Sequence, residues 1–217
     1  MNAKRRTPTA PWPAFKRSLV AILRGVQPEE IIDIGTALVD AGFEAIEVPL
    51  NSPDPFTSIE ALAKAVGDKC LVGAGTVLAA DDVHRLASAG GRLMVSPNID
   101  AEVMAAAAEH EMVTMPGVFT ATEALAAIAH GATALKFFPA STLGPDGINA
   151  IKAVLPSDMV IGAVGGVSHA DFERYMQIGV TAFGLGSSIY KPGLSAVDVS
   201  QRAEKTIAAY DKALSDT

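Results

Sequence analysis

The sequence predicts a single-domain (β/α)8 barrel, the TIM-barrel fold of the α/β class. Eight short apolar, β-prone runs have centres roughly 20 to 26 residues apart, which leaves room for one crossover helix in each interval. An open doubly wound sheet more often uses five or six strands and carries a glycine fingerprint after strand one, where this chain has Arg24-Gly25-Val26. The expected strands are residues 19–23, 45–48, 71–74, 93–96, 113–115, 134–138, 160–163 and 182–185.

The intervening segments carry helix signals. Proline stands at the start of residues 28–40, and Gly42 closes that segment. Thr120 and Glu123 form a capping box before residues 124–129. Ser168 is expected to cap a helix that runs to residue 178, and residues 196–214 supply the eighth helix.

Length and composition favour one globular domain. The chain has 217 residues, 49% of them hydrophobic, which is enough to bury a sizeable core. Residues 1–13 hold three basic residues and three prolines and are expected to form a loosely held N-terminal arm, in which a basic targeting signal is a lesser alternative. Residues 14–217 are expected to form the barrel domain.

Charge and cysteine usage restrict the partners. The net charge of -7 argues against nucleic acid or an anionic membrane as a general partner, so an anionic substrate would need a local cationic site. Cys70 is the single cysteine, and the sequence has neither a secretory h-region nor an apolar run of about 18 residues. The cytoplasm is therefore the expected location.

Lys136 lies in an apolar run, Ala134-Leu-Lys-Phe-Phe-Pro-Ala140, where an ammonium group would lose its hydration. Burial favours the neutral amine, which is a nucleophile toward carbonyl carbon. The alternative is a lysine that extends along the strand to reach water at the rim. The buried interpretation predicts an enzyme that forms imines.

Further polar residues mark the ends of other expected strands. Glu47 is surrounded by apolar residues, and burial would raise its pKa toward a value suited to proton transfer; the alternative is a structural ion pair with Lys136 or Arg24. The carboxyl ends of barrel strands carry the active site in this fold. The candidates at that end are Arg24, Glu47, Thr76, Pro97, Asn98 and Lys136.

Glycine-rich turns follow the last two expected strands. They are Gly165-Gly166 and Gly186-Ser187, at the two positions where these barrels usually bind phosphate through backbone N–H groups. The substrate is therefore expected to carry a phosphate. No metal is expected, because the four histidines have no close-spaced partner of the kind that zinc sites use.

Five motifs in order resemble the 2-keto-3-deoxy-6-phosphogluconate/phosphogalactonate aldolase family over about residues 18–213. The resemblance implies a homotrimeric TIM-barrel aldolase that needs no metal or other cofactor. It implies that Lys136 forms the Schiff base, that Glu47 is the acid/base, and that Arg24 and Thr76 hold the pyruvyl part of the substrate. It places phosphate at Gly165, Gly166, Gly186 and Ser187. The motifs are Gly73-Ala-Gly-Thr-Val-Leu78, Ser96-Pro-Asn98, Met115-Pro-Gly117, Lys136-Phe-Phe-Pro-Ala140 and Val164-Gly-Gly-Val167.

Two positions separate the branches of that family. Phosphogluconate aldolases typically carry an arginine after the catalytic glutamate and a threonine before the glycine pair, whereas this chain has Asn51 and Val164. The segments 48–53 and 163–166 resemble the phosphogalactonate branch instead. The gluconate epimer and 4-hydroxy-2-oxoglutarate remain alternative substrates. A phosphate-binding barrel with other chemistry, or a sugar-phosphate sensor, would leave Lys136 and Glu47 unexplained.

Overall fold

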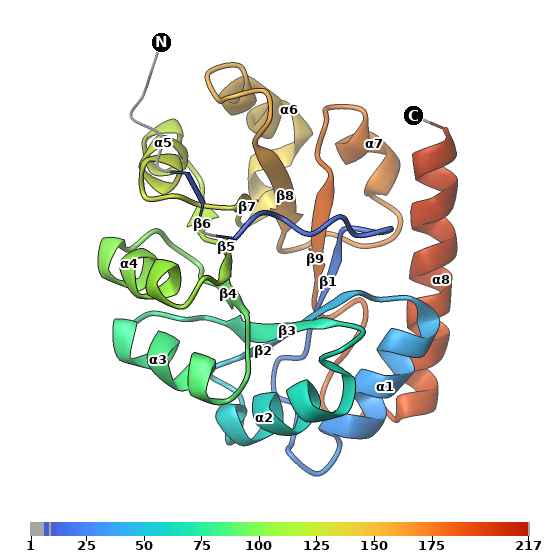
Figure 1. The fold of residues 1–217 in the computed structure, drawn as a ribbon. Coiled ribbons are helices and arrows are strands. Elements are labelled where there is room, and N and C mark those ends of the chain that lie inside the picture. Colours follow the sequence, from blue (N-terminus) through green and yellow to red (C-terminus); the bar gives the residue numbers. More distant parts are fainter. Residues whose placement is uncertain (1–6, 9, 217) are drawn as a thin grey trace.

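A computed structural model describes residues 7, 8 and 10–216 and shows one sheet of nine parallel strands curled into a barrel inside a ring of helices (Figure 1). The strand order is β5-β4-β3-β2-β1-β9-β8-β7-β6. This arrangement confirms the expected fold class. The strands are β1 Leu19–Ile22, β2 Ala45–Pro49, β3 Leu71–Gly75, β4 Leu93–Val95, β5 Val113–Met115, β6 Gly117–Val118, β7 Ala134–Phe137, β8 Val160–Val164 and β9 Ala182–Leu185.

Helices follow most of the strands and pack on the outside of the barrel. They are α1 Ile31–Ala41, α2 Pro55–Val66, α3 Ala80–Ser88, α4 Ala101–Glu109, α5 Ala121–Ala129, α6 Ala140–Lys152, α7 Phe172–Met176 and α8 Ala196–Ser215.

The expectation of eight strands is corrected to nine, because the fifth is divided at Pro116. Proline has no N–H to donate to a strand ladder, so pairing stops there and resumes one residue later. The carbonyl of Pro116 still accepts the backbone N–H of Lys136 at 2.9 Å. The first half, β5, pairs with β4 and the second half, β6, pairs with β7, so the two ends of the sheet meet at this proline and close the barrel.

Side-chain alternation along the strands separates two apolar cores. One core lies inside the barrel and includes Val20, Ala45 and Ala134. The other lies between strands and helices and includes Ile46 and Leu135, the neighbours of two of those residues. Successive side chains of a strand point to opposite faces, so a polar residue two positions beyond an interior alanine also points into the barrel.

Helix ends agree with the sequence signals at some places and differ at others. The Thr120–Glu123 capping box is confirmed, and Ser195 forms a second one with Asp198 at the start of α8. The expected cap at Ser168 is wrong. Its hydroxyl donates to the Asp171 carboxylate at 3.0 Å and so closes a turn before α7, which begins only at residue 172 and ends at 176.

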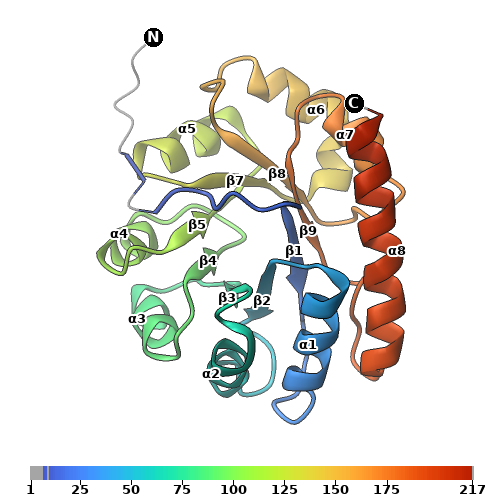
Figure 2. The ribbon, with the colours of Figure 1, turned by 45° about the vertical axis from the view of Figure 1, so that its right-hand side comes forward.

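The described part of the N-terminal segment crosses the amino-terminal end of the barrel (Figure 2). Trp12 and Phe15 pack against the interior core, and the Trp12 indole N–H donates to the Ser18 hydroxyl at 3.2 Å. The carbonyl of Ala10 accepts from the Thr133 hydroxyl at 3.0 Å. These residues therefore cover one mouth of the barrel, whereas the basic cluster at residues 4–6 lies outside the described residues.

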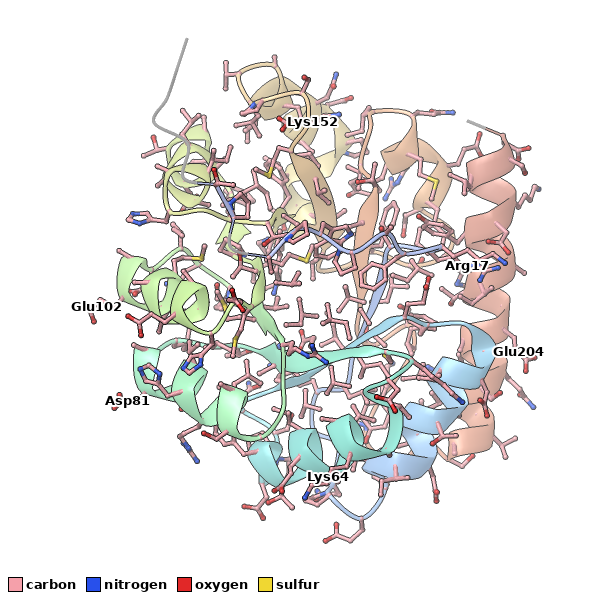
Figure 3. All side chains as sticks on the ribbon, viewed as in Figure 1. Arg17, Lys64, Asp81, Glu102, Lys152 and Glu204 are labelled. Carbon is pink, nitrogen blue, oxygen red and sulfur yellow. The ribbon has the colours of Figure 1, made fainter. Side chains whose placement is uncertain are left out.

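Most charged side chains lie on the outer surface, as the labelled residues of Figure 3 illustrate. Arg17 makes two hydrogen bonds of 2.6 Å to the Asp211 carboxylate and so attaches the start of the chain to α8. Within the described residues, no helix combines the length and the apolar character needed to span a membrane.

Candidate active site

Lys136 and Glu47 both project into the barrel interior. Each stands two residues beyond an interior alanine, Ala134 in β7 and Ala45 in β2, so alternation turns both side chains inward. Lys136 pairs in register with Gly117 and Gly162, neither of which has a side chain to fill the space beside it. The strand pattern therefore places an amine and a carboxylate in one apolar interior.

Lys136 is only 5% exposed, which disfavours its charged form. Burial is the main cause that lowers its pKa; the nearby Glu47 carboxylate opposes this effect, and the Arg24 guanidinium adds to it. The Nζ atom lies 4.7 Å from the centroid of the Phe138 ring. A lysine with a lowered pKa supplies more of the neutral amine that attacks a carbonyl.

Glu47 is 1% exposed, and burial raises its pKa to about 7. Lys136, Arg24 and the backbone N–H of Gly75 each act in the opposite direction. Gly75 is required sterically, because a Cβ atom there would lie 2.1 Å from Oε2 of Glu47. That same Oε2 atom has no hydrogen-bond partner among the described residues, so this carboxylate can both accept and donate a proton near neutral pH.

Arg24 follows β1 and is held by the loops after the next two strands. Its guanidinium donates to Oδ1 of Asn51, and a second, longer contact of 3.5 Å reaches the Thr76 hydroxyl. Thr76 has a φ of 56°, in the left-handed region, directly after β3. The guanidinium has further N–H groups that can donate two parallel hydrogen bonds to a substrate carboxylate.

A cavity of about 710 Å³ opens at the carboxyl ends of β1, β7, β8 and β9. The glycine turns line it, and Gly166 has a φ of 71°, which glycine adopts most easily. A Cβ atom at Gly166 would also lie 2.2 Å from the Ser141 hydroxyl. The residues that line the cavity include Arg24, Lys136, Phe138, Val164, Gly165, Gly166, Gly186, Ser187, Ser188, Tyr190 and Lys191.

The structure brings most of the expected residues together at this end. Thr76 joins through its contact with Arg24, and Glu47 through its electrostatic interaction with Lys136. Pro97 does not line the cavity; it lies against Gly117, where an added Cβ would be 2.2 Å from the Pro97 carbonyl oxygen.

Three features of the site were not predicted from the sequence. They are the Asn51 contact that holds Arg24, the Phe138 ring beside the Lys136 amine, and the loop at Tyr190 and Lys191. The position of Lys191 soon after a glycine turn was the one available signal for that loop.

Two histidines that are distant in the sequence lie close together in the structure. His84 on α3 and His110 after α4 lie with ring nitrogens 2.9 Å apart, although they are 26 residues apart in sequence. Both are exposed, and no group of three metal-ligating side chains occurs among residues 7, 8 and 10–216.

Burial, with a smaller effect from Glu44, raises the pKa of the Cys70 thiol to about 12, so this cysteine stays protonated and unreactive.

Comparison with known proteins decides the family. A protein-family model described as "KDPG and KHG aldolase" matches residues 15–206. The chain belongs to the KDPG and KHG aldolase family. A probable 2-dehydro-3-deoxy-6-phosphogalactonate aldolase of Rhizobium meliloti (strain 1021) is 62% identical to this aldolase-family chain, over 93% of the chain and 95% of the relative.

Two more distant family members agree with that assignment. The 2-dehydro-3-deoxy-6-phosphogalactonate aldolase of Escherichia coli (strain K12) is 47% identical over 92% of this chain and 97% of its own length. A solved structure described as native KDPGal matches the fold with a TM-score of 0.92 and 46% identity, over 94% of this chain and 99% of that chain. The family assignment therefore covers nearly the whole barrel.

Proposed function

We propose that this chain is a class I aldolase that cleaves 2-dehydro-3-deoxy-6-phosphogalactonate to pyruvate and D-glyceraldehyde 3-phosphate. The observation that carries the proposal is the buried pair of Lys136 and Glu47 at the carboxyl end of the barrel, beside a cavity lined by glycine turns. A phosphate-binding barrel with other chemistry would leave two features unexplained, the lowered pKa of Lys136 and the raised pKa of Glu47.

The substrate lies with its two anionic ends at opposite sides of the cavity. Arg24, supported by Asn51 and Thr76, binds the carboxylate next to the ketone. Backbone N–H groups at Gly165, Gly166, Gly186 and Ser187 bind the phosphate. Binding at both ends aligns the bond to be broken with the amine of Lys136. Pro97, which packs on Gly117, shapes the wall of the barrel behind Lys136.

Lys136 begins the reaction as a neutral amine. Nζ attacks the C2 ketone, water leaves, and a protonated imine forms that accepts the electron pair of the C3–C4 bond. As that bond breaks, Glu47 takes the proton of the C4 hydroxyl, directly or through one water, and glyceraldehyde 3-phosphate is released. Glu47 then returns a proton to C3 of the enamine, and hydrolysis of the imine releases pyruvate and restores the amine.

The preference for the galactonate epimer rests on Val164 and Asn51. Val164 lines the cavity directly before the glycine pair and offers no hydroxyl to the substrate. Asn51 is engaged by Arg24 and stands where the gluconate branch typically has arginine. The names of the 62% and 47% identical relatives support the same epimer.

We also propose a cytoplasmic homotrimer, as the family resemblance implies. The net charge of -7 supports a protein that is not held by nucleic acid or an anionic membrane. Sedimentation analysis tests the trimer, which is expected to have three times the chain mass of 22.4 kDa. A monomer or a dimer at assay concentration contradicts it.

An assay of pyruvate release tests the function. The protein is incubated with each C4 epimer and with 4-hydroxy-2-oxoglutarate, with pyruvate release coupled to lactate dehydrogenase, and Lys136→Ala serves as the inactive control. The galactonate epimer is expected to give the highest kcat/KM, and activity should persist in EDTA. Strong preference for the gluconate epimer contradicts the substrate, and loss of activity in EDTA that a divalent ion restores contradicts the metal-free mechanism.

A further inference from the structure

We infer that Lys191 is the side chain that binds the substrate phosphate and sets the preference for phosphorylated over unphosphorylated sugar acids. The inference rests on the proposed function, because it assigns a residue to the phosphate end of the same cavity. Neither the sequence motifs nor the family resemblance pointed to this lysine.

Among residues 7, 8 and 10–216, three cationic residues line the cavity: Arg24, Lys136 and Lys191. Arg24 is engaged by Asn51 and Thr76 at the carboxylate end, and Lys136 is the buried amine. Lys191 is exposed, and its side chain makes no hydrogen bond or ion pair with any of the described residues. It is therefore the cation of the cavity that remains available to a second anionic group.

The residues on both sides of Lys191 are anchored. Tyr190 is 3% exposed, and its hydroxyl donates to the Glu30 carboxylate in the segment before α1. Pro192 packs against Gly25, where an added Cβ would lie 2.9 Å from its ring. The loop after β9 is thus attached on both sides of Lys191 to the loop after β1, while the lysine side chain itself is free to reach into the cavity.

The chemistry of the ligand favours such a cation. Backbone N–H groups at the glycine turns give direction to phosphate binding, but they carry no net charge. The protein has a net charge of -7, and the proposed substrate adds a phosphate dianion to a carboxylate. An ammonium group at the phosphate end offsets that repulsion and makes charge-assisted hydrogen bonds to phosphate oxygens.

Lys191→Gln tests the inference, with Lys205→Gln on α8 as the matched control. Lys205 is likewise exposed, its side chain makes no hydrogen bond or ion pair with the described residues, and it does not line the cavity. For Lys191→Gln, kcat/KM on the phosphorylated substrate should fall ~10- to 100-fold, the scale of a lost hydrogen bond to a charged group. Most of the change should appear in KM, and Lys191→Arg should recover much of the loss because it restores the charge.

The same sugar acid without its phosphate provides the internal comparison. Its kcat/KM should change less than about twofold in Lys191→Gln, because no phosphate contact is lost. Lys205→Gln should leave both substrates unaffected. If Lys191→Gln lowers kcat/KM equally for both substrates, or for neither, Lys191 does not recognise phosphate.

Two binding measurements separate this inference from the proposed function. Labelling by pyruvate and borohydride needs no phosphate contact, so Lys191→Gln should be labelled as fully as the unchanged protein. Titration calorimetry with inorganic phosphate needs no aldolase chemistry, and its Kd should rise at least ~10-fold in Lys191→Gln. An unchanged Kd in Lys191→Gln, or no phosphate binding by the unchanged protein, overturns the inference. Absence of labelling in the unchanged protein overturns the proposed imine mechanism alone.

Discussion

Burial gives two side chains at the centre of the barrel their proposed chemistry. The pKa of Lys136 is lowered, and the pKa of Glu47 is raised to about 7. Desolvation is the first cause of both shifts, and the attraction between the two groups limits each of them. Glu47 can consequently exchange protons around neutral pH.

The raised pKa of Glu47 predicts a pH profile for cleavage. Glu47 must be ionised to take the C4 proton, so raising the pH through about 7 increases the active fraction. We expect kcat/KM to fall about tenfold per pH unit on the acid side, because kcat/KM reports the pKa values of the free enzyme. A profile that stays flat from pH 8 to pH 5 contradicts this role for the carboxyl.

Glu47→Gln separates proton transfer from imine formation. The amide fits the same space beside Gly75 but cannot take up the proton, so turnover is expected to fall ~10²- to 10⁴-fold. Lys136 remains in place, and the variant should still be labelled slowly by pyruvate and borohydride. Nearly full turnover in Glu47→Gln means that another group or a water molecule moves the proton.

Val164→Thr tests the choice of epimer. Threonine adds one hydroxyl at the cavity wall, beside Gly165, with little change in volume. The ratio of the two kcat/KM values is expected to shift about tenfold toward the gluconate epimer, which corresponds to ~1.4 kcal/mol, the scale of a neutral hydrogen bond. Both epimers are assayed with both proteins, and an unchanged ratio removes Val164 from the account of specificity.

The loops that follow β1, β8 and β9 form much of the cavity and are held in place by contacts with other elements. The loops after β1 and β9 are joined by the Tyr190–Glu30 hydrogen bond and by the packing of Pro192 on Gly25. The loop after β8 is fixed by the bond from the Ser141 N–H to the Gly165 carbonyl at 3.0 Å. The turns proposed to hold the phosphate therefore depend on neighbours from other elements.

Tyr190→Phe tests the connection between the loops after β1 and β9. Loss of the hydroxyl leaves the Glu30 carboxylate without that donor and loosens the segment that carries Lys191. We expect the free energy of unfolding to fall by about 1 kcal/mol and KM for the phosphorylated substrate to rise while kcat changes little. Thermal unfolding and steady-state kinetics provide the two readouts, and a lowered kcat with unchanged KM contradicts this positioning role.

Elements that rest on local patterns were predicted well from the sequence. The burial of Glu47 and Lys136 was expected from their apolar neighbours in two short strands, and the Thr120 cap from a spacing of three residues. Ser168 was assigned wrongly because a serine before a helical pattern resembles a cap, whereas its hydroxyl is used by Asp171 in a preceding turn.

At the scale of the whole molecule, features that depend on distant segments could not be predicted. The closing role of Pro116 depends on which strands stand on either side of it. Tyr190 and Glu30 are 160 residues apart, and His84 on α3 and His110 after α4 are 26 residues apart, so neither pair leaves a local signal in the sequence. Tyr190 and Glu30 meet because the loops that carry them follow β9 and β1, two paired strands whose carboxyl ends lie at the same mouth of the barrel.

If burial in the barrel makes Lys136 a nucleophile, pyruvate and borohydride should label this lysine. The protein is mixed with pyruvate and borohydride, digested and analysed by mass spectrometry. We expect a reduced pyruvyl adduct on Lys136, and no adduct in Lys136→Ala or in Lys136→Arg, whose guanidinium stays protonated. An adduct on Lys152 or Lys191 instead, or no adduct at all, would mean that Lys136 does not form the Schiff base.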